Sequence, residues 1–329
     1  MYYDELETTM EHLLQEGKGI LAADESIGTI GKRFEQINIE NTAQNRFTYR
    51  ELLANTTNLE KYINAVILFE ETFESFNNIN IADIFNQKDI ITGIKVDKGL
   101  INLSNTNDEK ITQGLDNLSE RLMSYKKLGA KFAKWRNVYL ISESTPSLTA
   151  IKAGSEVLAR YAATCQSLGI VPIVEPEVLI DGNHSIDDCA EATEIVLHEL
   201  FKALFIHQVE LETMILKPSM ITCGKDYTPF STPEEIAEYT ISVFRNTVPA
   251  AVPSINFLSG GQTALQATIN LNAINNVGNQ PWKLSFSYGR ALQDDCLKIW
   301  QGKPSQVSLA QQALLKHAEC NSLASLGKY

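Results

Sequence analysis

The chain has 329 residues, of which 44% are hydrophobic and 21% are charged, an ordinary composition for a globular enzyme. Its formal net charge of −12 argues against nucleic acid or an anionic membrane as the main partner, because both require a basic face. No apolar run approaches the roughly 18 residues that span a membrane, and the acidic start Met1–Glu7 lacks the layout of a signal peptide.

The cysteines and histidines exclude two further kinds of site. The 5 cysteines lie far apart without a Cys-x-x-Cys pair, so we expect neither a zinc framework nor disulfides, and a cytoplasmic location. The 5 histidines have no metal-binding spacing, so we expect no metal.

A short amphipathic helix is predicted first, over residues 3–15, with apolar side chains at Leu6, Met10, Leu13 and Leu14. A pattern then recurs, in which a short apolar run ends in charged residues and is followed by a loop and an amphipathic segment of helical length. The runs are Ile20–Ala23, Ala65–Phe69, Ile91–Val96, Phe132–Val138, Ile170–Val174, Met214–Leu216, Ser254–Leu258 and Lys283–Phe286.

Strands that alternate with helices in this number are typical of a (β/α)8 TIM barrel. The sequence therefore predicts an α/β fold with a single domain over residues 1–329, which has a short N-terminal helix and a C-terminal tail. The rival is an open, doubly wound sheet with Gly-x-Gly-x-x-Gly after its first strand. Here Gly17-x-Gly19 precedes that strand, so no dinucleotide cofactor is expected.

Several helix boundaries can be predicted from local signals. Thr145-Pro146 is expected to open a helix that runs to Gly169, with proline at the first helical position. Ser185–Asp188 predicts another helix start, and Thr232–Glu235 forms a capping box. Residues 76–87 and 102–110 are expected to be loops.

A lysine closes the sixth apolar run, in Glu212-Thr213-Met214-Ile215-Leu216-Lys217-Pro218. Since proline cannot continue a strand, Lys217 is expected where the strand leaves the sheet, partly out of water. At the usual lysine pKa only roughly one amine in two thousand is neutral at pH 7. Burial or a second cation would raise that fraction and make the amine a nucleophile toward a carbonyl. The alternative is a lysine with a buried stem and a solvated head.

Charged residues end most of the other runs as well. In a barrel the carboxyl ends of the strands form the active site, so these residues would meet at one mouth in an otherwise acidic protein. Lys134 and Arg136 are two residues apart and share a face of their strand, as do Glu175 and Glu177. The residues expected at the mouth are Asp24, Lys95, Lys134, Arg136, Glu175, Glu177, Lys217, Ser259 and Arg290.

Two loops have the composition of a phosphate site. Ser259-Gly260-Gly261 follows the seventh run, and Ser287-Tyr288-Gly289-Arg290 follows the eighth. Glycines let backbone N–H groups approach an anion, and Arg290 can bind it with two donors. Barrel enzymes often hold phosphate in these two loops.

A group of hydroxyl and basic residues follows Asp24: Ser26, Thr29, Lys32 and Arg33. Their spacing places them along one side of a helix. This group is either a solvated first turn or a second anion site across the mouth from the first. The second interpretation predicts a substrate that is phosphorylated at both ends.

The motifs at these positions resemble those of class I (Schiff-base-forming) fructose-bisphosphate aldolase, in order along nearly the whole chain. They are Gly17–Ser26, Gly93–Gly99, Phe132–Arg136, Val171–Glu177, Leu216–Pro218, Phe257–Gly261 and Phe286–Arg290. The resemblance implies a metal-independent lyase without cofactor. Such an enzyme reversibly splits fructose 1,6-bisphosphate into dihydroxyacetone phosphate and glyceraldehyde 3-phosphate, in glycolysis and gluconeogenesis. It also implies a homotetramer.

The resemblance assigns roles by position. Lys217 would form the imine with the ketose carbonyl, Glu175 would be the acid/base that expels water, and Asp24 would take the proton of the C4 hydroxyl. Lys134 and Arg136 would supply positive potential beside Lys217, with Glu177 in the same catalytic set. One phosphate would be held by Ser259, Gly260, Gly261, Ser287, Gly289 and Arg290, and the other by Ser26, Thr29, Lys32, Arg33 and Lys95.

The chain departs from the family pattern at a few places. Thr213 stands where the signature around the imine lysine usually has Gly, and Thr29 replaces a usual Ser. Animal members carry a mobile tail of about twenty further residues that ends in a Tyr, whereas this chain ends at Tyr329. Either Tyr329 or another group would return the proton to the enamine.

Two other functions are weighed against this one. The first is a Schiff-base lyase or transferase that acts on a singly phosphorylated sugar, which would not need the second anion site. The other is a non-catalytic barrel that binds partners such as cytoskeletal proteins. The joint presence of Asp24, Glu175 and Lys217 argues against a loss of catalysis.

Overall fold

Eight parallel strands close into a barrel in the computed structural model, which describes residues 3–329. Met1 and Tyr2, which belong to the predicted domain and its acidic start, lie outside this range. The barrel strands are β1 (Gly19–Ala23), β2 (Ile63–Leu68), β3 (Ile91–Lys95), β6 (Phe132–Tyr139), β7 (Val171–Val178), β8 (Ile215–Leu216), β9 (Ser254–Phe257) and β10 (Lys283–Tyr288). Each overlaps one predicted run, which confirms the (β/α)8 fold.

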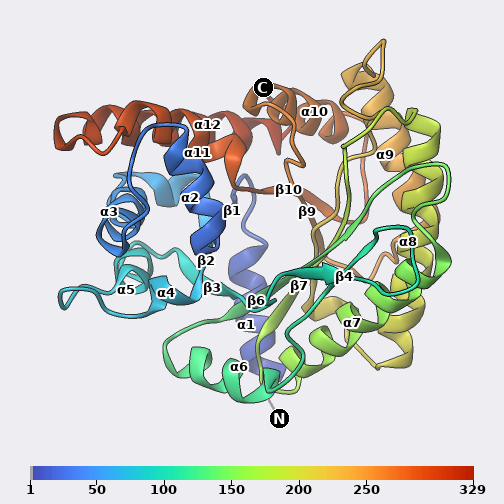
Figure 1. Ribbon diagram of the computed structural model, residues 1–329, viewed down its shortest axis with the longest axis horizontal. Coiled ribbons are helices and arrows are strands. Elements are labelled where there is room, and N and C mark those ends of the chain that lie inside the picture. The colour runs from blue at the N-terminus through green and yellow to red at the C-terminus, as the bar shows by residue number, and fades with distance from the viewer. Residues whose placement is uncertain (1–2) are drawn as a thin grey trace.

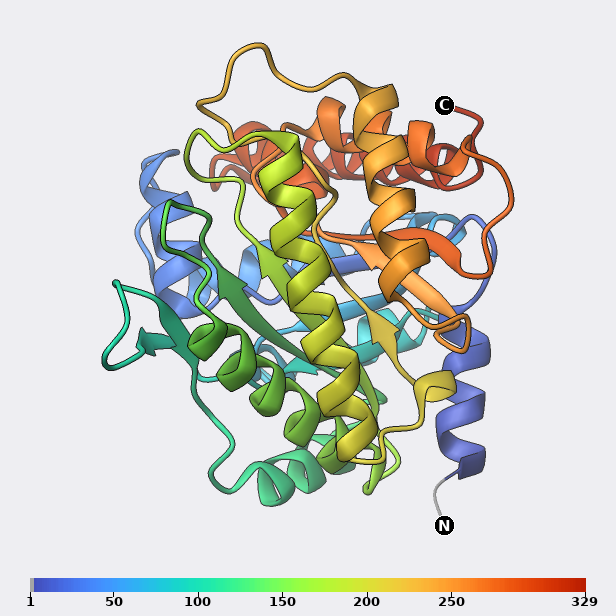
Figure 2. The ribbon, with the colours of Figure 1, turned by 90° about the vertical axis from the view of Figure 1, so that its right-hand side faces the viewer.

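Helices surround the barrel (Figure 1). They are α1 (Tyr3–Leu13), α2 (Ile27–Glu35), α3 (Ala43–Ala54), α4 (Glu70–Phe73), α5 (Ile81–Asn86), α6 (Leu118–Lys127), α7 (Leu148–Gln166), α8 (Ile186–Ile206), α9 (Pro233–Thr247), α10 (Ala264–Asn275), α11 (Arg290–Trp300) and α12 (Val307–Ala324). Figure 2 shows α7, α8 and α9 side by side over one flank of the strands. The last helix, α12, packs across α10, α11 and α3.

The first helix covers the amino end of the barrel. Its buried side chains Leu6, Met10 and Leu13 join barrel residues such as Ile20 and Phe132 in one apolar cluster. This cluster fills the amino half of the barrel. The barrel is therefore a packed core with its accessible mouth at the carboxyl end.

Some boundaries differ from the predictions. The helix expected from Pro146 to Gly169 is α7, which begins at Leu148 behind the capping residue Ser147 and ends at Gln166. Ser147 accepts from the Ala150 N–H, and a capping hydroxyl specifies the start more strongly than the nearby proline. The predicted caps at Ser185 and Thr232 are both complete capping boxes.

The predicted loop at residues 76–87 contains the short helix α5, capped by Asn80, so this prediction was wrong. Of the predicted loop at residues 102–110, residues 103–109 connect the hairpin strands β4 (Leu100–Asn102) and β5 (Lys110–Thr112), and the two end residues belong to the strands. Helix α5 has only 6 residues, which is shorter than the window in which periodicity indicates a helix.

Proline in β7 shows how the barrel accommodates the site. Two strands flank β7. On one side, β8 pairs with β7 only at Ile173 and Val174. On the other side, β6 pairs with β7 along the whole length of β7. Beyond Val174, one edge of β7 has no partner strand, so Pro176 removes no ladder bond there. Glu175 and Glu177 therefore lie within the strand, beside the gap that the short β8 leaves.

Candidate active site

Lys217 follows directly on β8, as the sequence predicts. Its backbone N–H donates to the Val174 carbonyl at 2.8 Å, and this bond fixes the point where the chain leaves the sheet. The side chain is only 4% exposed, and its Nζ lies 3.1 Å from Oε1 of Glu175. The amine is therefore held inside the mouth of the barrel by a carboxylate, which excludes the alternative of a head that reaches water.

A chain of alternating charges runs from Lys217 across the barrel. Oε2 of Glu175 lies 2.7 Å from Nζ of Lys134, and the same Nζ donates to Oδ2 of Asp24 at 3.1 Å. Lys217 and Asp24 directly follow β8 and β1, whereas Glu175 and Lys134 lie within β7 and β6, and all four side chains are nearly buried. Because each charge has an opposite neighbour, the barrel can keep all four out of water.

This arrangement shifts the pKa of each group. Burial lowers the pKa of Lys217, and Lys134 lowers it further, although Glu175 acts in the opposite direction. Burial would raise the pKa of Asp24, but Lys134, Lys217 and Lys95 outweigh it and bring the pKa to about 2. The pKa of Glu175 is lowered because the same kind of cationic neighbours outweigh its burial. The resting site therefore holds two carboxylates and a lysine that loses its proton more readily than a lysine in water.

Lys134 has the opposite shift, although it is buried as deeply. Burial alone would lower its pKa, but Asp24 and Glu175 raise it well above the usual value. Lys134 is thus a permanent cation. The predicted positive potential beside Lys217 comes from this residue, while burial is the larger cause of the shift at Lys217.

Three of the remaining predicted charges, Arg136, Glu177 and Lys95, pair beside this chain. Nε of Arg136 donates to Glu177 on the neighbouring strand. Nζ of Lys95 lies 2.7 Å from Oδ1 of Asp97, a buried partner that the sequence analysis did not single out. The structure therefore brings these residues to the mouth already paired.

The two glycine loops have geometry suited to an anion. Gly260 and Gly261 have φ values of 52° and 87°, a left-handed conformation that favours glycine. Helix α11 begins at Arg290 behind Gly289, and no side chain caps its first N–H groups. Oγ of the buried Ser287 has no partner. Free N–H groups at a helix start attract anions, so the loop that leads into α11 keeps donors available.

The group after Asp24 lies on the first turns of α2. Ser26 caps the helix, and its Oγ lies 3.0 Å from Oγ1 of Thr29. Lys32 is exposed, whereas Arg33 is buried, so these two residues point to different sides of the helix. The sequence predicted that all four residues lie along one side of the helix, and this prediction was wrong.

The position of this group also differs from the prediction. Arg33 donates from Nη2 to Oδ1 of Asp294 at 3.1 Å, and Asp294 lies one turn after Arg290 on α11. Because β1 pairs with β10, the groups at α2 and α11 are neighbours. The expectation that they lie across the mouth was wrong, since a closed barrel brings its first and last strands together.

Tyr329 is not brought to the mouth. Its backbone N–H donates to Oδ1 of Asn272 near the end of α10, and Leu326 packs against Gly17 in the loop that enters β1. This is the amino rim of the barrel, and β1 separates it from the carboxyl ends by roughly 15 Å. In this position, the side chain of Tyr329 cannot reach the amine of Lys217.

Thr213 lies away from the amine of Lys217. It ends the 3-10 helix Leu211–Thr213 that leads into β8, on the amino side of that strand. Its buried hydroxyl accepts from Nε2 of Gln166 at 2.9 Å. The departure from the family pattern thus has a polar partner of its own and does not touch the charged chain.

Sequence reasoning missed Glu25, Asp97 and Arg50. Glu25 pairs with both Arg33 and Arg50, and the only signal was its position beside Asp24. Arg50 lies inside α3 at an ordinary helical position, and no spacing connects it with the site.

Within residues 3–329, no group of three or more His, Cys, Asp or Glu side chains is arranged to hold a metal ion. No helix in this range is both long and apolar enough to cross a membrane.

Comparison with known proteins identifies the family. The family model for class-I fructose-bisphosphate aldolase matches residues 5–329. Fructose-bisphosphate aldolase of Plasmodium falciparum is 50% identical over 330 aligned positions, covering 99% of this chain and 89% of that protein. Fructose-bisphosphate aldolase 5, cytosolic, of Arabidopsis thaliana is 51% identical over 331 positions, covering 100% of this chain and 92% of that protein.

A solved structure agrees with these relatives. It is a ternary co-crystal structure of the Plasmodium falciparum aldolase in complex with TRAP and a small-molecule inhibitor, with a TM-score of 0.98 at 50% identity. The similarity covers 100% of this chain and 96% of that one. The chain therefore belongs to the class I fructose-bisphosphate aldolases, metal-independent lyases of glycolysis that act on a phosphorylated sugar through a Schiff base.

Proposed function

We propose that Lys217 forms the Schiff base through which this aldolase cleaves fructose 1,6-bisphosphate. The observation that carries the proposal is the chain of contacts from Lys217 through Glu175 and Lys134 to Asp24. It joins a lysine of lowered pKa to one carboxylate beside it and a second carboxylate across the mouth. An imine needs the first carboxylate, and cleavage of a carbon–carbon bond needs the second.

Glu175 is the proton carrier of imine formation. Its carboxylate takes a proton from the Lys217 ammonium, 3.1 Å away, and the neutral amine attacks C2 of the ketose. A proton then moves from nitrogen to oxygen within the adduct, and Glu175 returns its proton to the hydroxyl that leaves as water. The product is a positively charged imine, and Glu175 is again a carboxylate.

Asp24 is the base of the cleavage step. Its lowered pKa keeps it ionised, so it accepts the proton of the C4 hydroxyl. C4 becomes an aldehyde as the C3–C4 bond breaks, and the electron pair moves to the imine nitrogen to give an enamine. Lys134, 3.1 Å from Asp24 and 2.7 Å from Glu175, stabilises both carboxylates while they exchange protons.

The order of strands gives the substrate a direction. The β9 loop with Ser259, Gly260 and Gly261 is next to β8, whose lysine binds C2, so we assign it the C1 phosphate. Asp24 on β1 takes the C4 proton, and the residues of α2 follow it directly. We therefore assign the C6 phosphate to Ser26, Thr29, Lys32, Arg33 and Lys95. Ser287, Gly289 and Arg290 lie between the two groups, since β10 is between β9 and β1.

We further propose a single-domain enzyme that assembles as a homotetramer in the cytosol. Relatives from chickpea and Arabidopsis are named cytoplasmic or cytosolic isozymes. At the end of α8, Phe205 and Ile206 are 83% and 64% exposed, and a subunit contact would cover this apolar surface. Light scattering, with a mass four times that of the chain as the expected result, tests the assembly.

Substitution Lys217→Met tests the assigned nucleophile. The variant keeps the length and burial of the side chain but cannot form an imine, so cleavage should fall by at least about a thousandfold. The measurement is the release of triose phosphates by purified protein. The matched control is Lys131→Met, an exposed lysine just before β6. Comparable activity in Lys217→Met and wild type would assign the chemistry to another group.

A further inference from the structure

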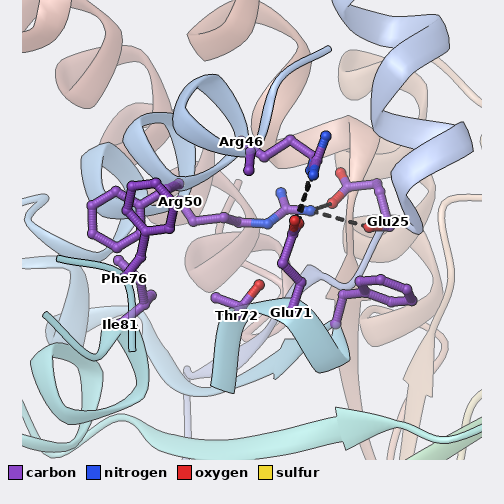
Figure 3. A pocket seen from close by; sticks show the side chains of 10 residues that line it. Glu25, Arg46, Arg50, Glu71, Thr72, Phe76 and Ile81 are labelled. Carbon is purple, nitrogen blue, oxygen red and sulfur yellow. Dashed lines mark hydrogen bonds and ion pairs between the residues drawn. The ribbon is translucent and has the colours of Figure 1, made fainter. Parts of the chain in front are cut away.

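A carboxylate beside the catalytic aspartate lies between two buried arginines. Glu25 accepts a hydrogen bond from Nη1 of Arg33 on α2, and its Oε2 lies 2.7 Å from Nη2 of Arg50 on α3. The side chain of Glu25 is 11% exposed and that of Arg50 only 6%. Figure 3 shows Arg50 reaching Glu25, while Arg46 of the same helix reaches Glu71.

The two arginines have different access to the substrate. Arg33 follows the helix start that holds Ser26 and Thr29, and its second nitrogen contacts the half-exposed Asp294. Nη2 of Arg50 is bound by the carboxylate and, at 3.4 Å, by the carbonyl of Glu25. Arg50 lines a small cavity of about 30 Å³ between α3 and α4, together with Arg46, Phe47 and Phe76. Arg50 can therefore influence the substrate site through its ion pair with Glu25.

The charges explain what this contact does. Arg33 contacts two carboxylates, Glu25 and Asp294, so these three groups alone carry a net charge of −1. The second guanidinium, that of Arg50, brings the net charge of the cluster to zero, and it shares the hydrogen-bonding capacity of Glu25 with Arg33. These contacts are strong because Glu25, Arg33 and Arg50 are all nearly buried.

We propose that Arg50 is a positioning residue for recognition of the C6 phosphate. It binds the Glu25 carboxylate and offsets its negative charge, so that the surroundings of Arg33 repel the substrate phosphate less. The residue thereby contributes to the preference for a bisphosphate over a singly phosphorylated ketose. This inference rests on the proposed assignment of the C6 phosphate to the group that includes Arg33.

The test compares kcat/KM for fructose 1,6-bisphosphate with that for fructose 1-phosphate. In Arg50→Met, kcat/KM for the bisphosphate should fall by about tenfold or more through KM, while that for fructose 1-phosphate stays within about twofold. Arg50→Lys, which keeps the charge, should restore most of the loss. An equal loss for both substrates overturns the proposal.

Two further variants separate this role from a structural one. Arg46→Met removes an arginine from the same helix and cavity without touching Glu25, and it should leave the ratio of the two substrates unchanged. The double variant Arg50→Met/Glu25→Gln removes the carboxylate that competes for Arg33, so it should recover bisphosphate affinity relative to Arg50→Met. A shifted ratio in Arg46→Met, or no recovery in the double variant, contradicts the mechanism.

Arg33→Ala distinguishes failure of this inference from failure of the phosphate assignment. If Arg33→Ala leaves KM for the bisphosphate unchanged, the assignment itself is wrong and the inference falls with it. If Arg33→Ala raises that KM and Arg50→Met does not, the assignment stands and the role of Arg50 alone is refuted.

Discussion

Lys134 lies between two carboxylates and controls the charge of its neighbours on both sides. Its Nζ contacts Asp24 and Glu175, and its charge lowers the pKa of Asp24, Glu175 and Lys217 alike. At the residue scale, the pKa of Lys217 is therefore lowered by burial together with one neighbouring cation. Arg136, which the sequence paired with Lys134 in this role, is bound to Glu177.

Lys134→Met should move the pH dependence of cleavage. Without this cation, Lys217 faces Glu175 and Asp24 alone, and its pKa rises, since a lost positive neighbour and two unbalanced carboxylates both favour the ammonium. The rising limb of kcat/KM against pH should shift to higher pH, and activity at pH 7 should fall about tenfold for each pH unit of the shift.

The measurement is a profile of kcat/KM between pH 5 and 10 for wild type, Lys134→Met and the control Lys131→Met. Lys131 is exposed and precedes the same strand, so its loss should leave the limb in place. If the rising limb of kcat/KM lies at the same pH in Lys134→Met as in wild type, the charge of Lys134 does not lower the pKa of Lys217, and burial alone sets it.

The pairing of these residues could be predicted only in part. Alternation along a strand indicates that Lys134 and Arg136 share a face, and the structure agrees. Which carboxylate each cation meets depends on the stagger between β6, β7 and β1, and no local pattern encodes it. Glu25 was missed for the same reason, since its partners Arg33 and Arg50 lie on α2 and α3. Asp97 pairs with Lys95 only two residues away, so stagger between strands does not explain why it was missed.

At the scale of elements, the barrel strands are the best predicted part of the chain because apolar runs between helical segments have few alternatives. The shortest elements were missed or misplaced. α5 has six residues, and α7 begins at a hydroxyl cap two residues from the predicted start. A proline and a capping hydroxyl can each mark the start of a helix, and a six-residue segment can form a helix or a loop. Tertiary contacts then decide which local structure forms.

Glycine in β3 shows how closely the strands pack. A Cβ at Gly93 would lie 2.2 Å from Cε2 of Phe132, whose ring is fully buried on the adjacent strand. Gly93→Ala should therefore lower the free energy of unfolding by about 1–3 kcal/mol, because the ring must leave its place.

Urea unfolding with and without the substitution measures this effect. Gly28→Ala on α2 is the control, because no atom lies within 4 Å of the added Cβ and alanine favours a helix by up to about 1 kcal/mol. If Gly93→Ala and Gly28→Ala have the same stability, the ring of Phe132 is not packed against β3 as described.

At the scale of the whole molecule, closure of the barrel assembles the site. Asp24 and Lys217 are far apart in sequence, yet the ring of strands places both at one mouth, with Lys134 and Glu175 between them. The sequence predicted this meeting because barrel sites lie at the carboxyl ends of strands. The sequence analysis placed the groups at α2 and α11 on opposite sides of the mouth. They are neighbours because β1 pairs with β10, a contact between the two ends of the chain that the order of elements does not indicate.

The tail shows the same limit. Tyr329 is the last residue of the chain, and its position depends on contacts with Asn272 and on the packing of Leu326 near β1. Nothing in the local sequence of the tail specifies this rim of the barrel over the other. The proton that returns to C3 must come from a group other than this tyrosine while the tail is held there.

The central claim is that Lys217 carries the substrate, and chemical trapping tests it most directly. Wild-type protein is incubated with dihydroxyacetone phosphate, reduced with borohydride, digested and sequenced by mass spectrometry, with a sample reduced without sugar as the control. Borohydride converts an imine into a stable amine, so we expect one phosphorylated three-carbon adduct, on the peptide that contains Lys217. An adduct on Lys134 or another lysine, or no adduct in active protein, would contradict this account.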